Sequence, residues 1–303
     1  MSVVLFKIVP VLLTFLLGVL LRRAGLFNKS NADLFIKLFF HVAMPALILL
    51  SVPRLELSLK VVTLPLMAGL INLTAYGVAY VVGRRYHLDR PAFGVFILGS
   101  MVMNTGFTFP FILSAYGPEG MAFAALFDFG NAAVVLSFGY YLACRYGGDG
   151  NQGSMALLRK FLGSSPLIAL AVAVVFNLSG VHVPEVGIEF LKILGGMTTP
   201  LMMLSLGIYF DTRIFRTGPL SAVIALRMLL GLLLGSLCVV LFDLHGLVKV
   251  IVLILSSAPA GMMTLTYSTM ENLDKDFAAS VVSYSTLIGL FLVPLFILLL
   301  PVH

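Results

Sequence analysis

Apolar stretches long enough to cross a membrane recur from one end of this chain to the other. A helix needs roughly 20 apolar residues to cross about 30 Å of hydrocarbon. We predict ten such helices, at about residues 3–21, 34–52, 61–83, 92–115, 120–144, 161–178, 187–209, 218–242, 247–268 and 277–300. Only 11% of the residues are charged, against about a quarter in soluble domains. The sequence therefore predicts an all-α polytopic membrane protein.

Lysine and arginine residues are divided unevenly between the two sides of the predicted helices. With the N-terminus outside, the inner side contains Arg22, Arg23, Lys29, Arg84, Arg85, Arg90, Arg145, Arg159, Lys160, Arg213, Arg216 and Lys275. The outer side then contains only Lys7, Arg54, Lys60 and Lys249. Because cytoplasmic loops are the positive ones, we predict a cytoplasmic-membrane protein with both termini outside. The net charge of +6 thus has a topological origin and does not indicate a nucleic-acid partner.

The two halves of the chain resemble each other. The segment "FIKLFFHVAMPALILLS" (35–51) matches "FLKILGGMTTPLMMLSL" (190–206) in its phenylalanine, lysine, proline and one leucine, and the same spacing matches Gly25 with Gly180. Five predicted helices in each half make the second copy inverted relative to the first, which is common in secondary transporters. We therefore expect two repeats, 1–144 and 159–303, joined by a glycine-rich hinge at 145–158.

The fourth and ninth predicted helices contain residues that interrupt helices. The fourth includes "GSMVMNTGFTFPFILSAYG" (99–117), and the ninth includes "SSAPAGMMTLTYS" (256–268). Proline removes a backbone donor and clashes with the preceding turn, and the freed groups are costly in lipid unless they line a polar cavity. Two ordinary proline kinks are the alternative interpretation.

We predict that Pro110 and Pro259 begin the second halves of these helices, since proline is favoured in a first turn. Two facing N-termini would suit an anion near the middle of the membrane. The polar side chains that could bind it are Asn104, Thr105, Thr108, Ser256, Ser257 and Thr264. At nearly the repeat spacing, the pair Asn104–Thr105 matches Ala258–Pro259.

Two charged residues lie well inside predicted helices. Asp128 has Asn131 three residues later on the same helix face, and a carboxylate inside a membrane costs at least about 2.5–3.5 kcal/mol on insertion scales. Asp128 could couple transport to protons, hold a cation, or brace neighbouring helices. Arg227 is the basic residue near the middle of a predicted helix and matches Asn72 at the repeat spacing. Arg227 could pair with Asp128 or face the cavity and attract anions.

Enzymatic motifs are missing from the sequence. There is no HExxH, Gly-x-Ser-x-Gly or P-loop pattern, so neither a hydrolase nor an ATP-driven pump is indicated. Cys144 and Cys238 show no metal-binding spacing, and we expect no metal or cofactor. The segment "GLLLG" (231–235) is typical of small-residue helix packing.

Three longer segments resemble the auxin efflux carrier family. They are "LLGVLLRRAGLFNKSNADLFIKLFFHVAMPALILLS", "MNTGFTFPFILSAYGPEGMAFAALFDFGNAAV" and "SSAPAGMMTLTYSTMENLDKDFAASVVSYSTL". The similarity keeps order and spacing over nearly the whole chain. It implies two inverted five-helix repeats, as in the bile-acid sodium symporters, with crossed helices 4 and 9.

The resemblance also implies that the helices form two units with different roles. Helices 1, 2, 6 and 7 would form a scaffold through which a homodimer could form, and helices 3–5 and 8–10 a transport unit that moves like an elevator. By the same resemblance, Asn104 would contact a substrate carboxylate, and Pro110 and Pro259 match the prolines of the crossing. Many members have an asparagine after the second proline, where this chain has Gly261–Met262–Met263.

The central loop is short, as in the compact prokaryotic members associated with malate or malonate. We therefore expect a secondary transporter of a small organic anion, a carboxylate, dicarboxylate or auxin-like acid, with coupling to protons as one hypothesis. A membrane-embedded anion sensor or channel is the rival class. A sodium-coupled symporter ranks lower because no cluster of acidic and amide residues suggests a sodium site.

Overall fold

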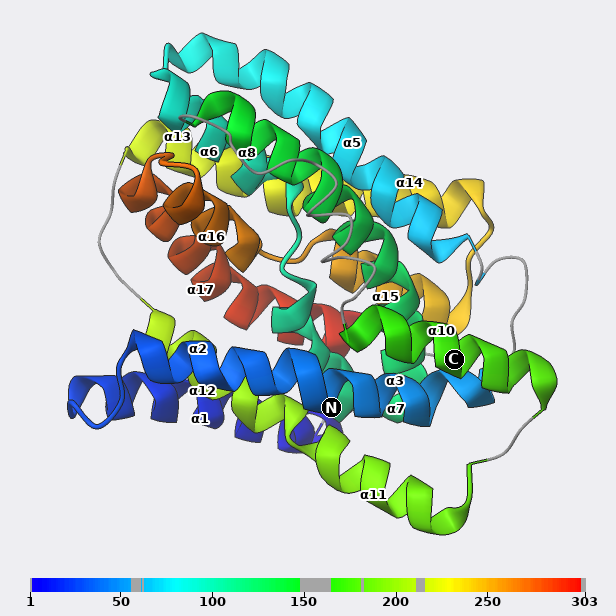
Figure 1. Ribbon diagram of the computed structural model, residues 1–303. Coiled ribbons are helices and arrows are strands. Elements are labelled where there is room, and N and C mark those ends of the chain that lie inside the picture. The colour runs from blue at the N-terminus through cyan, green and yellow to red at the C-terminus, as the bar shows by residue number, and fades with distance from the viewer. Residues whose placement is uncertain are drawn as a thin grey trace.

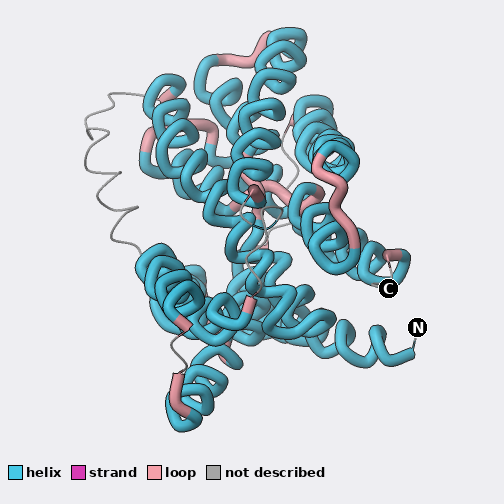
Figure 2. The backbone as a smooth tube through the Cα atoms, turned by 90° about the vertical axis from the view of Figure 1, so that its right-hand side faces the viewer, coloured by secondary structure: helices cyan, strands magenta, loops and turns pink. Residues whose placement is uncertain are grey.

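The computed structural model describes residues 2–55, 61, 63–147, 165–180, 183–210 and 216–300, and these are almost entirely helical (Figures 1 and 2). The α-helices are α1 (Ser2–Arg23), α2 (Lys29–Leu38), α3 (Met44–Ser51), α5 (Leu64–Gly83), α6 (Arg90–Met101), α7 (Thr105–Val134), α8 (Tyr140–Tyr146), α10 (Ser165–Ser179), α11 (Glu185–Gly196), α12 (Thr198–Tyr209), α13 (Thr217–Ile224), α14 (Gly231–Leu241), α15 (Gly246–Ser256), α16 (Met262–Met270) and α17 (Lys275–Leu299).

Short turns of other helix types join some of these helices into longer ones. Turns of π-helix connect α2 to α3, α7 to α8 and α13 to α14, at Phe39–Ala43, Val135–Gly139 and Ala225–Leu230. Single 3₁₀ turns follow α3 and α5, at Val52–Arg54 and Arg84–Tyr86. α7 itself contains a kink at Gly117, where φ is +65° and ψ is −158°.

Six helical segments in the described part of the chain are long and apolar enough to cross a membrane: Lys29–Arg54, Leu64–Tyr86, Thr105–Tyr146, Glu185–Tyr209, Thr217–Leu241 and Lys275–Leu299. Ser165–Ser179 and Gly246–Ser256 are shorter apolar helices. Every one of the ten predicted ranges contains helix. The predicted hinge lies outside the described residues from 148 onward, as do Lys60, Arg159, Lys160 and Arg213.

Local sequence explains where several helices begin and end. Asn28 caps α2, because its side chain accepts from the Ser30 and Asn31 amides while Asn31 bonds back to the Asn28 amide. Gly25 and Gly180 follow α1 and α10 with φ of +71° and +67°, a region that glycine enters without steric cost. These two glycines are the pair matched in the sequence.

The helices form two layers in Figure 1. α1, α2, α3, α11 and α12 run across the lower part of the view, where α12 packs against α1 and α2, and α3 against α10 and α11. α5, α6, α8, α13 and α14 lie at the top, and α16 and α17 lie between. α7 packs against α5 and also against α3 and α12, so it links the two layers.

Glycines allow the closest helix contacts. A Cβ atom added to Gly207 would lie 2.2 Å from the Phe15 carbonyl oxygen, and one added to Gly235 would lie 2.0 Å from Ser256 Oγ. α12 therefore approaches α1 backbone to backbone, whereas Gly235 of α14 leaves room for the Ser256 side chain of α15. This confirms the packing role predicted for the "GLLLG" segment, since lipid offers helices no hydrophobic reason to associate and small residues let backbones come close.

We expect Gly207→Ala to lower the thermal stability of the detergent-solubilised protein, because the new methyl group meets fixed backbone rather than a movable side chain. Overpacking of this kind costs about 1–3 kcal/mol. Gly77→Ala in α5 is the matched control, because its Cβ would meet nothing within 4 Å. The control should melt at the wild-type temperature or slightly above it, and equal destabilisation by both changes would contradict the proposed close contact.

Candidate functional site

Two helices are interrupted where the sequence predicted breaks. α6 ends at Met101 and α7 begins at Thr105, while α15 ends at Ser256 and α16 begins at Met262. We call the two unwound segments, 102–104 and 257–261, the crossing. They run antiparallel and meet in an isolated β-bridge between Met103 and Ala260. The predicted breaks in the fourth and ninth helices are therefore confirmed.

The two unwound segments satisfy each other's backbone. The Asn104 amide donates to the Pro259 carbonyl at 2.8 Å, and the Gly261 amide donates to the Val102 carbonyl at 2.9 Å. The Ala260 amide donates to Ser285 Oγ of α17 at 3.1 Å. Unpaired backbone groups at membrane depth are very costly, so each break depends on the presence of the other.

The prolines do not begin the second helix halves, contrary to our prediction. Pro110 lies inside α7, five residues after its first residue, and Pro259 lies within the unwound segment. The N-cap of α7 is instead Asn104, whose side chain accepts from the Phe107 amide at 3.2 Å. A polar N-cap defines a helix start as effectively as proline does.

The equivalent position in α16 is Gly261, an N-cap with no side-chain hydrogen bond. The predicted match of Asn104 with Ala258 is therefore wrong by three residues. The second unwound segment has five residues and the first has three, so a constant spacing cannot hold through the break.

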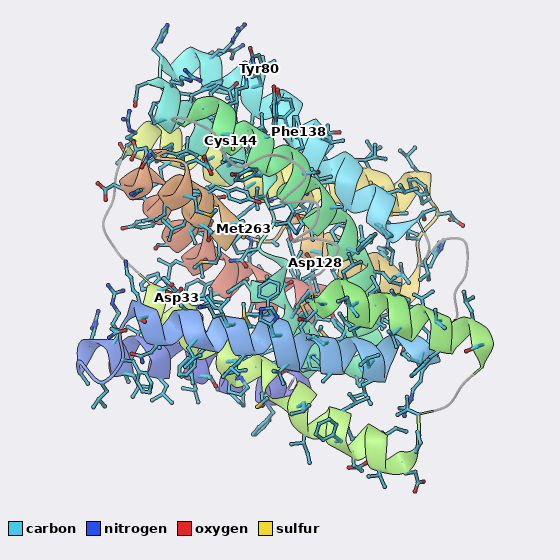
Figure 3. All side chains as sticks on the ribbon, in the orientation of Figure 1. Asp33, Tyr80, Asp128, Phe138, Cys144 and Met263 are labelled. Carbon is cyan, nitrogen blue, oxygen red and sulfur yellow. The ribbon has the colours of Figure 1, made fainter. Side chains whose placement is uncertain are left out.

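A cavity of about 990 Å³ ends at the crossing. Side chains from α2 and α12 line one side of it, and side chains from α7, α16 and α17 line the other. Figure 3 places Asp128 and Met263 near the centre of the molecule, and Asp33 towards one end of α2. Lys29, Asp33, Lys275 and Asp276 all line this cavity and come from the N-terminal halves of α2 and α17. The cavity thus reaches from charged helix ends to the crossing.

Four polar side chains form a hydrogen-bonded chain beside the crossing. Thr105 Oγ1 donates to Asp128 Oδ1 at 2.6 Å, and Asn131 Nδ2 donates to the same oxygen at 2.9 Å. Asn72 Nδ2 then donates to Asn131 Oδ1 at 2.9 Å. Asp128, Thr105 and Asn131 line the cavity, while Asn72 is fully buried in α5. The carboxylate is therefore held by neutral donors and also faces the cavity.

Hydrogen-bond donors at the inner end of the cavity have no partner among the described residues. Asn104 is 6% exposed and its Nδ2 bonds to no described residue, although Asn104 lines the cavity. Gly261, Met262 and Met263 at the start of α16 also line it, and the first amides of a helix have no partner within the helix. An amide side chain and an uncapped helix N-terminus thus lie together at one place.

Arg227 takes neither of the two positions that the sequence left open. Its side chain is fully buried and is not part of the cavity wall. The guanidinium donates to the carbonyls of Met101 at 2.9 Å and Ser256 at 2.5 Å, with longer contacts to Ala258 and Ser100 at 3.3 and 3.5 Å. Arg227 therefore contacts the C-terminal ends of α6 and α15 rather than Asp128.

Other predicted binding residues lie behind the cavity wall. Thr108 Oγ1 donates to the Thr105 carbonyl at 2.7 Å, and Ser257 Oγ to the Leu253 carbonyl at 2.8 Å. Thr264 is fully buried, and its hydroxyl has no partner among the described residues. Of the predicted set, the cavity exposes Asn104, Thr105, Asp128 and Asn131.

Sequence reasoning missed the wall that faces the crossing. Met202, Leu206 and Tyr209 of α12 line it at helical spacing, and the Tyr209 hydroxyl donates to Asp33 of α2. One methionine, one leucine and one tyrosine among many apolar residues carry no signal of their own. The charged residues at the start of α2 and α17 were visible, but only the structure brings them to one cavity.

Comparison with known proteins identifies the family. A family model described as membrane transport protein matches residues 3–297. The chain belongs to this family, the auxin efflux carriers. Two archaeal proteins, each described as an uncharacterized transporter, are similar to it. The one from Methanothermobacter thermautotrophicus is 28% identical over 293 residues, covering 95% of each chain.

The second, from Methanocaldococcus jannaschii, is 28% identical over 295 residues, covering 94% of this chain and 95% of the relative. The similarity therefore extends over nearly the whole length of this chain. The protein is a multi-pass membrane transporter and not an enzyme.

We expect a cysteine at position 266 of the transporter to react with a charged, water-soluble thiol reagent, and one at position 264 to be protected. Thr266 lines the cavity, whereas Thr264 is fully buried. In a background lacking Cys144 and Cys238, Thr266→Cys should label at least about tenfold faster in detergent than Thr264→Cys, because thiol reactivity follows exposure. Equal rates would show that the cavity is not open to water.

Proposed function

We propose that this protein is a secondary transporter of a small organic anion, a carboxylate or dicarboxylate, which binds where the cavity meets the crossing. The observation that carries the proposal is the pair of unused donors there: Asn104 Nδ2 and the N-terminus of α16. A helix N-terminus has about half a positive charge and free amides, which suits a carboxylate. The cavity of about 990 Å³ lies at the large end of small-molecule sites.

Asp128 gives a physical reason for coupling to protons. A carboxylate substrate beside an ionised Asp128 would be repelled, by about 4 kcal/mol at roughly 4 Å and an effective dielectric of about 20. Protonation of Asp128 removes this repulsion. Its Oδ1 accepts from Thr105 and Asn131, while its Oδ2 bonds to no described residue. We therefore propose that a proton on Asp128 accompanies the bound anion.

We further propose that the two sets of helices move against each other as scaffold and transport unit. The two layers support this, because the cavity lies between α2 and α12 on one side and α7, α16 and α17 on the other. The shared left-handed conformation of Gly25 and Gly180 supports the inverted repeat. With the N-terminus outside, the charged ends of α2 and α17 would face the cytoplasm, so the structure would represent an inward-open state.

A homodimer through the scaffold remains part of this proposal. α11 exposes Val186, Phe190 and Ile193 at its outer surface, and these side chains are available to lipid or to a second copy of the chain.

Uptake into proteoliposomes tests the function and the site together. We would offer malate, malonate, succinate, an indole carboxylate and a neutral amino acid to wild type, Asn104→Ala and Asn104→Ser. Wild type should show saturable uptake of at least one carboxylate and none of the amino acid. Both variants should lose about ten- to a hundredfold in apparent affinity, since a hydrogen bond to a charged group is worth about 1.5–3 kcal/mol.

The serine variant separates the two roles of Asn104. Serine caps a helix about as well as asparagine, so it keeps an acceptor for the Phe107 amide. Its shorter side chain places no donor at the position of Nδ2. Full activity in Asn104→Ser with loss in Asn104→Ala would reduce Asn104 to a structural cap. Ligand binding without saturable flux would instead favour a sensor.

Asp128→Asn should uncouple uptake from the pH gradient. Asparagine keeps an oxygen that can accept from Thr105 and Asn131, but it cannot exchange a proton. Wild-type uptake of the transported carboxylate should therefore rise with an imposed pH gradient, and uptake by the variant should not. The control is the same gradient collapsed by a protonophore. Wild-type uptake that does not change with the pH gradient, or that depends on a sodium gradient, would rule out proton coupling. The proposal of anion transport would be unaffected.

A further inference from the structure

Arg227 is a fully buried cation without an acidic partner among the described residues. Its hydrogen bonds to described residues all go to backbone carbonyls, two from the end of α6 and two from the end of α15 and the residues beyond it. A buried charge is costly unless it is compensated. Here the compensation comes from helix C-termini, where unpaired carbonyls carry about half a negative charge per helix.

The guanidinium changes the net charge of the helix ends at the crossing. Four helix ends meet at the crossing: the C-termini of α6 and α15 and the N-termini of α7 and α16. At about half a charge each, two negative and two positive ends cancel. With Asp128 protonated, as proposed above, and without Arg227, the crossing would have no net attraction for an anion. With Arg227 against the two C-termini, the two N-termini are left with about one uncompensated positive charge.

We propose that Arg227 is the positioning residue that makes the crossing selective for anions, by neutralising both helix C-termini from behind the cavity. This inference rests on the proposed function and adds a residue that does not touch the substrate. Met101 and Asn104 are three residues apart, so at most about 10 Å of chain separates the contacted carbonyl from the anion site. At that separation a buried unit charge still acts strongly.

The surroundings of Arg227 are shaped for a guanidinium. A Cβ atom on Gly231, one turn further along the helix, would lie 2.5 Å from Arg227 Nη2 and 2.1 Å from the Ser256 carbonyl oxygen. Glycine at this position therefore leaves room for the contact between Arg227 and Ser256. Arginine also offers five donors in a planar fork, enough to reach carbonyls from two different helices at once.

Two substitutions separate charge from hydrogen bonding. Arg227→Lys keeps the charge and loses the fork, whereas Arg227→Gln keeps amide donors and loses the charge. We would measure the Michaelis constant and maximal rate for the carboxylate that wild type transports best, and inhibition of that uptake by its primary amide, for example malonamide for malonate. Thermal melting in detergent monitors folding of each variant.

The electrostatic role predicts an asymmetric result. Arg227→Gln should raise the Michaelis constant for the carboxylate by about tenfold, from one unit charge at about 10 Å and an effective dielectric of about 20, with inhibition by the neutral amide unchanged. Arg227→Lys should stay within about threefold of wild type. If Arg227→Gln does not fold, Arg227→Met repeats the neutral test, because methionine is an unbranched, flexible side chain that can fill the space left by the arginine.

Other results would overturn the inference. Wild-type carboxylate affinity in folded Arg227→Gln or Arg227→Met would show that the charge is irrelevant to anion binding. Equal losses for the carboxylate and the amide, or equal losses in the lysine and glutamine variants, would make Arg227 a structural brace only. Either result leaves the proposed function intact. Absence of carboxylate uptake by wild type would instead refute the proposed function, and this inference with it.

Discussion

The backbone hydrogen bonds between the two unwound segments are the constraint on which the rest of the structure depends. A chain in lipid cannot leave amides and carbonyls unpaired, yet α6–α7 and α15–α16 both break near their middles. The Met103–Ala260 bridge resolves this, because each break supplies the partners that the other needs. Two segments more than 150 residues apart in the sequence must therefore meet, and the polar end of the cavity forms where they do.

Around this bridge the partially negative and the partially positive helix ends face different surroundings. The helix C-termini lie against Arg227, away from the cavity, whereas Asn104 and the start of α16 lie at its inner end. Asp128 is held beside them by Thr105 and Asn131. Arg227 and Asn72, which match at one spacing in the sequence, have different roles, since Arg227 contacts backbone carbonyls while Asn72 donates to Asn131. Under the proposed repeat, the two halves thus carry different chemistry at matched positions.

Much of this architecture could be predicted from the sequence because lipid imposes a simple rule on helix length. Every predicted range contains helix, and the two polar, proline-containing runs mark the two breaks. The details at the breaks could not be predicted. The sequence placed a helix start at Pro110, whereas Asn104 caps the helix six residues earlier. Both residue types are typical of helix starts, and the sequence does not show which of two nearby signals is used. The extra residues in the second break shifted the match from Gly261 to Ala258. The partners of Arg227 could not be predicted because every residue has a backbone carbonyl, so the sequence does not show which carbonyls a buried guanidinium will contact.

The difference between the two N-caps has a consequence for the energetics of the transport cycle. In an ideal inverted repeat, exchanging the halves would turn one access state into the other, so the two states would have equal free energy. Asn104 caps α7 with its side chain, while Gly261 leaves α16 open. Because the two N-caps differ, the two access states need not have equal free energies. Under the proposed repeat, the empty carrier therefore has a preferred resting side, and the sequence at two cap positions contributes to which side it is.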